Sequence, residues 1–174
     1  MVPCHNVAGG GDDDARTSTG IAGQLGPINS PTTLNSHLNF VQFWDGRAAT
    51  LEEQAAGPIA NPIEMGGSLE DAVAYLASES SYVEDFGEAF DGTITADTIT
   101  EAIAEYERTL VTPNSPFDQW LAGNDDAMSE EALTGLEHFM DLGCTSCHTG
   151  AGLGGTAYQK MGLVHDYFAE RGGE

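Results

Sequence analysis

The chain has 174 residues, 40% of them apolar, which is enough to bury a hydrophobic core in one compact domain or two small ones. Its 28 acidic residues against 5 basic ones give a formal net charge of −23, which repels phosphate backbones and argues against a nucleic-acid partner. The acids are spread among apolar residues, so we expect a folded protein whose acidic surface suits a salty habitat or a basic redox partner. No apolar run reaches the roughly eighteen residues of a membrane helix, and no signal pattern opens the chain, so we expect no membrane span.

Loop-forming residues fill the first part of the chain, from Gly9 to Asp14 and again from Gly20 to Asn35. Helix starts follow, most of them with a hydroxyl at the cap position and a carboxylate three residues later. We expect these starts at Thr50 with Glu53, Ser68 with Asp71, Thr98 with Glu101, and Ser129. The segment GTITAD is the one short strand candidate, so the sequence predicts an all-α fold.

Two later segments have the strongest helical periodicity. Residues 98–111 place Ile99, Ile103, Tyr106 and Leu110 on one face, which predicts a helix packed on a core. Residues 129–144 place Leu133, Leu136 and Met140 on one stripe that stops at Gly143. Between them, residues 112–120 contain two prolines, and we predict a domain boundary there, with domains at 1–113 and 114–174.

A Cys-X-X-Cys-His motif, formed by Cys144, Cys147 and His148, follows the second of these helices. Two thiols at this spacing can form thioethers to one porphyrin, and the adjacent imidazole can then bind the iron. A zinc site would need a second ligand pair, and a thioredoxin-type pair would need alternating strands and helices. We therefore predict haem c attached to Cys144 and Cys147 with His148 as iron ligand; the alternative is a structural thiol pair.

The chain begins with an incomplete copy of this motif. Cys4 and His5 match its last two positions, and Met1 stands where the first cysteine would be. By itself, such a dipeptide is more typical of an ordinary terminus than of a haem site.

Three segments resemble the bacterial dihaem cytochrome c peroxidase family, which is related to the dihaem enzyme of methylamine utilisation. They are residues 26–66, residues 102–123, and GCTSCHTG with YQKMG behind it. The resemblance implies two cytochrome c-like haem domains, a peroxidatic one first and an electron-accepting one, incomplete here, second. It also implies a second haem c on Cys4 with His5 as iron ligand. We expect a fragment that begins inside the first motif; a single thioether through Cys4 and an empty first site are the alternatives.

The resemblance places Gln54 and Glu64 on the distal side of the first haem. Heterolytic cleavage of peroxide needs a carboxylate that moves a proton from one oxygen to the other, and an amide that positions the substrate. Without the resemblance, Glu64 is a solvated loop carboxylate and Gln54 a residue of a helix surface.

Three further residues are candidates for roles in electron transfer, haem binding and calcium binding. Trp44 matches the tryptophan that lies between the family's two haems and helps electrons to cross. Arg47 can pair with a haem propionate or with Asp45, and the ion pair is the simpler expectation. Asn29 matches a ligand of the family's interdomain calcium site.

One position departs from the family pattern. Many members hold a removable histidine over the first haem, and Ile21 occupies that position here. Because isoleucine cannot bind iron, we expect a five-coordinate haem at His5 that needs no reductive activation. We interpret Met161 as a packing residue, and His37 and His165 as surface or core residues rather than ligands.

The resemblance implies an enzyme that reduces hydrogen peroxide to water with electrons from a small c-type cytochrome or a cupredoxin. It implies a possible homodimer, and covalent haem attachment implies the periplasm. The rival interpretations are a mono-haem electron carrier, an inactive fragment, and a dihaem oxidase that modifies a partner protein.

Overall fold

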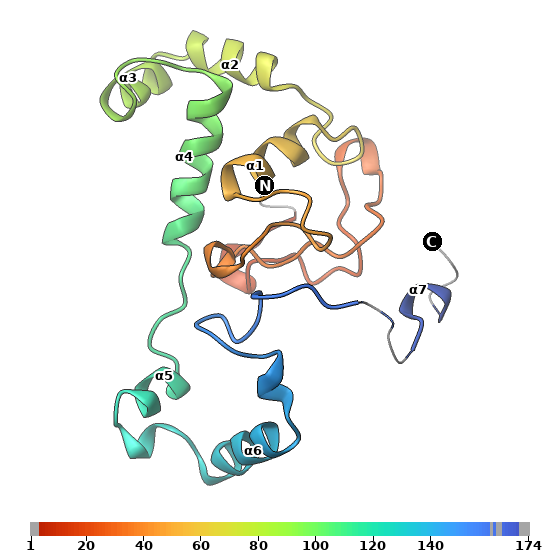
Figure 1. The fold of residues 1–174 in the computed structure, drawn as a ribbon. Coiled ribbons are helices and arrows are strands. Elements are labelled where there is room, and N and C mark those ends of the chain that lie inside the picture. Colours follow the sequence, from red (N-terminus) through yellow and green to blue (C-terminus); the bar gives the residue numbers. More distant parts are fainter. Residues whose placement is uncertain (1–3, 161, 163–164, 171–174) are drawn as a thin grey trace. The chain divides into compact units, whose positions relative to one another are not determined.

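The computed structural model describes residues 4–160, 162 and 165–170. Helices, turns and irregular segments make up these residues, which contain isolated β-bridges and no β-strand, and the GTITAD segment forms a turn and the start of a helix. The prediction of an all-α fold is therefore confirmed. The α-helices in Figure 1 are α1 (Leu51–Ala60), α2 (Leu69–Ser78), α3 (Ser80–Ala89), α4 (Ala96–Thr109), α5 (Pro116–Leu121), α6 (Glu130–Asp141) and α7 (Tyr167–Glu170). Short 3-10 turns are η1 (Val7–Gly9), η2 (Ile21–Gly23), η3 (Ser36–Leu38), η4 (Asp125–Ala127) and η5 (Cys144–Ser146).

The chain divides into two compact units. The first contains the residues up to 37 together with 41–110, and the second contains 38–40 together with the residues from 111 onward. The break after residue 110 lies just before the proline-containing stretch in which the sequence places a boundary. Assignment of one haem domain to each side of it, at 1–113 and 114–174, stays a prediction.

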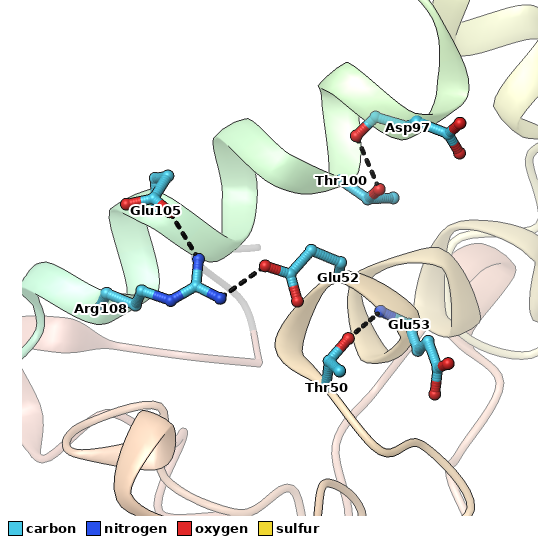
Figure 2. A network of polar contacts seen from close by, with 7 residues as sticks. All are labelled: Thr50, Glu52, Glu53, Asp97, Thr100, Glu105 and Arg108. Atoms are coloured by element: carbon cyan, nitrogen blue, oxygen red, sulfur yellow. Dashed lines mark hydrogen bonds and ion pairs between the residues drawn. The ribbon is translucent and has the colours of Figure 1, made fainter.

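Helix α1 packs on α4 in the first unit, and α2 contacts both α3 and α4. The buried apolar residues come mainly from α1 and α4 and from the segments that flank them. Arg108 of α4 also forms ion pairs with Glu52 of α1 and Glu105 of its own helix, as Figure 2 shows. The hydrogen bond from Arg108 lowers the pKa of Glu52, so this contact persists at neutral pH. The buried apolar side chains are Ala48, Leu51, Ala55, Phe86, Ile99 and Ala104.

Most of the predicted helix starts are confirmed. The hydroxyl of Thr50 accepts a hydrogen bond from the backbone of Glu53 (Figure 2), and Ser68 and Ser129 cap α2 and α6 in the same way. The start predicted at Thr98 is wrong, because α4 begins at Ala96 and its cap is Thr95. Thr98 supplies a hydroxyl, in place of the usual carboxylate, to close the capping box with Thr95.

The buried face of α4 is also rotated relative to the prediction. Ile99 is buried as expected, but Tyr106 is 55% exposed. Ala104 is completely buried, and its small side chain allows a closer approach by neighbouring elements than a tyrosine would allow. The same rotation buries Glu107.

Replacing Glu107 by glutamine is expected to stabilise the protein at neutral pH. Burial raises the pKa of this carboxyl, partly offset by the charge of Arg108, and the carboxylate has no hydrogen-bond partner in the described part of the chain. A raised folded-state pKa means that stability is full at low pH and decreases as pH rises through that pKa. We expect Glu107→Gln to gain roughly 1 kcal/mol in urea unfolding at pH 7.

The gain should disappear below about pH 4, where the wild-type carboxyl is neutral as well. Glu101→Gln is the matched control, because Glu101 lies on the same helix and is exposed. A wild-type protein more stable than Glu107→Gln at pH 7 would show that the buried charge is compensated.

The second unit carries α5, α6 and the Cys-X-X-Cys-His motif. Helix α6 ends at Asp141, and Gly143 follows it in the left-handed region with φ 78°. This is the conformation in which glycine ends a helix without steric cost, so the predicted glycine stop is confirmed. In the described ranges, no helix combines the length and the apolar character needed to cross a membrane.

Candidate functional site

The Cys-X-X-Cys-His motif winds into a single turn directly after α6. The backbone amides of Cys147 and His148 both donate to the carbonyl oxygen of Cys144, at 3.2 and 2.9 Å. The thiols of Cys144 and Cys147 are free, the first half-buried and the second exposed. The turn therefore presents two unpaired thiols and one imidazole within five residues, which is the donor set that haem c needs.

The orientation of His148 also fits iron ligation. The His148 Nδ1 lies 3.0 Å from the carbonyl oxygen of Leu153. The ring centroids of His148 and of Phe139 from α6 are 5.7 Å apart. A carbonyl accepts hydrogen bonds only, so Nδ1 carries the proton and Nε2 keeps a free lone pair. This is the arrangement in which a histidine binds a metal through Nε2.

The same arrangement recurs near the start of the chain. His5 follows Cys4, whose thiol is free, and its Nδ1 lies 3.3 Å from the carbonyl oxygen of Gly11. The loop that carries Gly11 is closed by hydrogen bonds from the amides of Gly9 and Gly11 to Asn6. Each of the two histidines thus follows a free cysteine and directs Nδ1 to a nearby backbone carbonyl, which leaves Nε2 of both imidazoles available to bind a metal.

Helix α1 carries Gln54 and contains a proline in its C-terminal half. Pro58 lies inside the helix and has no amide hydrogen, so the helical hydrogen bond to the carbonyl of Gln54 is missing. Gln54 is half-buried, and its side-chain amide has no hydrogen-bond partner within the described ranges. The amide is therefore free to bind a small polar molecule.

Glu64 lies in the loop that follows α1, and Asn61 holds its side chain. The Asn61 amide donates to Glu64 Oε1 at 2.6 Å, while Asn61 Oδ1 accepts from the backbone of Ile63 at 3.1 Å. The loop is also bonded to the end of α1, because the carbonyl of Pro58 accepts a hydrogen bond from the Met65 amide and that of Ile59 accepts one from the Gly67 amide. Helix α1 and the Glu64 loop therefore form one local structure that carries both predicted distal residues.

Asn61 is a residue of the site that the sequence patterns did not predict. A signal for it exists, because asparagine before Pro62 at the end of a helix is typical of a side chain that bonds its own backbone two residues on. What the sequence does not contain is the second contact, from the Asn61 amide to the Glu64 carboxylate.

The segment from Gly20 to Gln24 packs against the Glu64 loop. The Ile21 amide donates to the carbonyl of Glu64 at 2.8 Å, and Gln24 Nε2 donates to the carbonyl of Pro62 at 3.1 Å. A β-carbon at Gly20 would collide with the backbone carbonyl of Ile63, so only glycine permits this approach. Ile21, at the position where the resemblance expects a removable ligand, is thus part of a segment bonded to the loop.

Trp44 and Asn29 lie together in the first unit. The Trp44 indole N–H donates to the backbone carbonyl of Asn29 at 2.9 Å, yet the Trp44 residue is 55% exposed. The Asn29 side chain donates to the carbonyl of Ala15 at 2.8 Å. No group of three or more His, Cys, Asp or Glu side chains that could bind a metal occurs in the residues with described positions, so the calcium role of Asn29 stays a prediction.

Arg47 forms the expected ion pair with Asp45, at 2.8 Å, and its guanidinium lies 3.4 Å from the centre of the Phe43 ring. Burial raises the pKa of Asp45, but the hydrogen bonds and charge of Arg47 outweigh it and lower this pKa overall. Phe43 also contacts α1 at Gly57, where a β-carbon would approach the ring to 2.9 Å. The turn that carries Trp44 is thereby packed against the helix that carries Gln54.

Two other imidazoles, those of His37 and His165, differ in their surroundings. His165 is exposed and lies 3.3 Å from Glu170. His37 is half-buried, and its Nδ1 has no hydrogen-bond partner in the described part of the chain. Met161, interpreted from the sequence as a packing residue, lies outside the described residues.

An all-α chain with a Cys-X-X-Cys-His turn directly after an amphipathic helix is of the cytochrome c-like class. Residues 2–126 match the family described as di-haem cytochrome c peroxidase. The chain is 51% identical over 165 residues to cytochrome c551 peroxidase of Nitrosomonas europaea, covering 94% of this chain and 49% of that protein. It is 40% identical over 138 residues to the methylamine utilization protein MauG of Methylophilus methylotrophus, covering 77% of this chain and 41% of that protein. The chain therefore belongs to the di-haem cytochrome c peroxidase family.

A solved structure agrees with this assignment. The crystal structure of a MauG-like protein associated with microbial copper homeostasis has a TM-score of 0.78 and 28% sequence identity, covering 87% of this chain and 46% of that chain. The chain spans about half the length or less of the relatives that it matches, with 49% and 41% coverage for the two named above. The family implies haem c as cofactor.

Proposed function

We propose that the chain binds haem c at two positions. Cys144 and Cys147 attach one haem with His148 as iron ligand, and Cys4 attaches the other with His5 as iron ligand. The observation that carries this proposal is the shared geometry of the two histidines, each with Nδ1 near a carbonyl oxygen, at 3.0 Å for His148 and 3.3 Å for His5. A histidine that binds a metal through Nε2 almost always donates its other ring N–H to a carbonyl, a carboxylate or water, and both histidines are placed to do so.

We infer that the protein reduces hydrogen peroxide to water. The haem on His5, when bound, supplies the peroxide-binding iron and the redox chemistry of the reaction. Glu64 accepts a proton from one peroxide oxygen and delivers it to the other as that oxygen leaves. Gln54 donates a hydrogen bond that orients the peroxide, and Asn61 keeps the Glu64 carboxylate in one place through its 2.6 Å hydrogen bond.

We propose that electrons come from a small c-type cytochrome or a cupredoxin and enter at the haem on His148. Trp44, whose indole is held by Asn29, assists their passage toward the haem on His5.

Asn29 contributes to a calcium site, and Arg47, already paired with Asp45, has donor capacity left for a haem propionate. Covalent haem attachment supports a periplasmic location, and a homodimer is the proposed assembly.

A mono-haem electron carrier is the second candidate. The observation in its favour is that Cys144, Cys147 and His148 form a complete haem-binding motif in one turn. In that case the haem on His148 carries electrons and Glu64 has no catalytic role.

The proposed function is tested with haem-loaded protein, a reduced small c-type cytochrome as donor, and hydrogen peroxide as substrate. Peroxide-dependent oxidation of the donor is expected, with two donor molecules consumed for each peroxide because the reduction of peroxide to water takes two electrons. If the protein accepts electrons from the donor but peroxide does not increase donor oxidation, the mono-haem electron carrier is favoured.

The oxidised haem on His5 is expected to give a high-spin spectrum, because Ile21 cannot bind iron and the Gly20–Gln24 segment is bonded to the Glu64 loop. Ile21→His should restore a nitrogen ligand and convert that signal to low spin. Leu25→His is the matched control, since Leu25 directly follows that segment and is 66% exposed. A six-coordinate low-spin spectrum of this haem in the oxidised wild type would contradict the expectation.

A further inference from the structure

The loop that orients His148 has little intrinsic order. Residues 150–155 read GAGLGG, so four of the six are glycines. Gly150, Leu153, Gly154 and Gly155 all have positive φ, at 78°, 49°, 153° and 67°. Glycine loses more backbone freedom on folding than any other residue, and a left-handed leucine is strained. The carbonyl of Leu153, which accepts the His148 Nδ1 hydrogen bond, therefore needs contacts from outside the loop to hold it in place.

Those contacts come from Leu38–Phe40. These residues lie far before the loop in the sequence, yet they belong to the same compact unit. The Phe40 amide donates to the carbonyl of Gly155 at 2.9 Å. The ring of Phe40 meets the ring of Tyr158 edge to face, with centroids 5.0 Å apart and planes at 80°. The loop is thus fastened on its C-terminal side by one hydrogen bond and one aromatic pair.

The same tripeptide also contacts the loop on the other side of Leu153. A β-carbon at Gly152 would lie 3.7 Å from the β-carbon of Leu38, which is ordinary van der Waals contact. At Gly155 a β-carbon would collide with the side-chain oxygen of Asn39 and lie 3.4 Å from the Asn39 α-carbon, so the loop contacts this residue directly. Leu153 therefore lies between two points at which the loop touches Leu38–Phe40.

We propose that Leu38–Phe40 is a positioning element for the haem ligand His148. It fixes the glycine-rich loop, the loop fixes the Leu153 carbonyl, and this carbonyl fixes the protonated Nδ1 and the ring orientation of His148. The inference rests on the haem site proposed above at Cys144, Cys147 and His148. A hydrogen bond to Nδ1 makes the imidazole a more basic ligand, which favours the ferric over the ferrous state.

The test uses the full chain with haem attached, in a Cys4→Ala background so that Cys144 and Cys147 are the cysteines left to bind haem. In Phe40→Ala, the His148 Nδ1 proton is expected to exchange with solvent roughly tenfold faster by NMR, since losing contacts worth about one hydrogen bond raises the open population by about that factor. The midpoint potential of the haem should shift to more positive values. Leu38→Ala should shift both quantities in the same direction.

Phe40→Tyr keeps the ring and the edge-to-face contact, so it should restore the wild-type exchange rate and potential. Phe117→Ala is the matched control, because Phe117 forms an aromatic pair with Trp120 in the same unit, with ring centroids 6.0 Å apart. Phe40 is 44% exposed and Leu38 is 37% exposed, so neither change removes a core residue.

Unchanged proton exchange and potential in Phe40→Ala and Leu38→Ala, with haem attached, would overturn the positioning role and leave the haem site intact. The same shifts in Phe117→Ala would overturn it too, because they would indicate a general loosening of the unit. Absence of covalent haem in the Cys4→Ala protein would overturn the haem site itself, and this inference with it.

Discussion

Replacing Glu64 by glutamine is expected to lower peroxide turnover by about 10²- to 10⁴-fold, the range typical of losing a general acid–base group. Glutamine has nearly the same shape, so the hydrogen bond from Asn61 can persist while the ability to carry a proton is lost. Haem content and the visible spectrum should not change. Steady-state turnover with a reduced cytochrome donor measures the effect. We expect kcat to decrease strongly and KM to change little.

Glu88→Gln is the control for Glu64→Gln, because Glu88 is exposed on α3 and the substitution removes the same charge. Asn61→Ala should give a smaller loss of turnover than Glu64→Gln, since it frees the carboxylate without removing it. Full turnover in Glu64→Gln would assign the proton transfer to another group and contradict the role given to this loop.

Removing both Cys144 and Cys147 by alanine substitution is expected to abolish nearly all turnover that depends on the protein donor. Without thioethers, the haem on His148 has no covalent attachment, and the proposed entry point for electrons is lost. Haem-stained gels under denaturing conditions and donor oxidation kinetics measure the two consequences.

The comparison variant is Cys4→Ala, which should remove the haem on His5 and abolish peroxide reduction. That variant should still accept electrons from the donor, whereas the double cysteine variant should not. Equal loss of electron acceptance in both variants would contradict the division of roles between the two haems.

Much of the helical architecture is predictable because it depends on local chemistry. The caps at Thr50, Ser68 and Ser129 and the glycine stop at Gly143 follow from short-range hydrogen bonding and backbone sterics. The error at Thr98 has the same origin. Thr95 and Thr98 can both cap a helix, and in the structure Thr95 is the N-cap while Thr98 is the third helical residue that bonds back to it.

Features that depend on tertiary packing were less predictable. Periodicity placed Tyr106 on the buried face of α4, but the packed structure buries Ala104 and Glu107 instead. A period of 3.6 residues identifies a stripe but not its orientation, and neighbouring helices decide which small residue lies at the centre of the contact.

The candidate site divides in the same way. Cys144, Cys147 and His148 can be found from their spacing alone, since the residues of this motif lie within five consecutive positions. The supporting contacts join distant residues, such as Ile21 to Glu64 and Phe40 to Gly155, and no local pattern encodes them. The resemblance supplied candidate roles for Gln54 and Glu64, whereas the role of Asn61 follows from its hydrogen bond to Glu64 in the folded chain.

The number of covalently bound haems per chain tests the central claim most directly. Intact mass spectrometry of protein matured with haem, combined with pyridine haemochrome quantification, gives that number without reference to activity. We predict two haems, one lost in the Cys144→Ala, Cys147→Ala protein and the other lost in Cys4→Ala. A single haem that disappears with Cys144 and Cys147 and is indifferent to Cys4 would contradict the peroxidase proposal and leave an electron carrier.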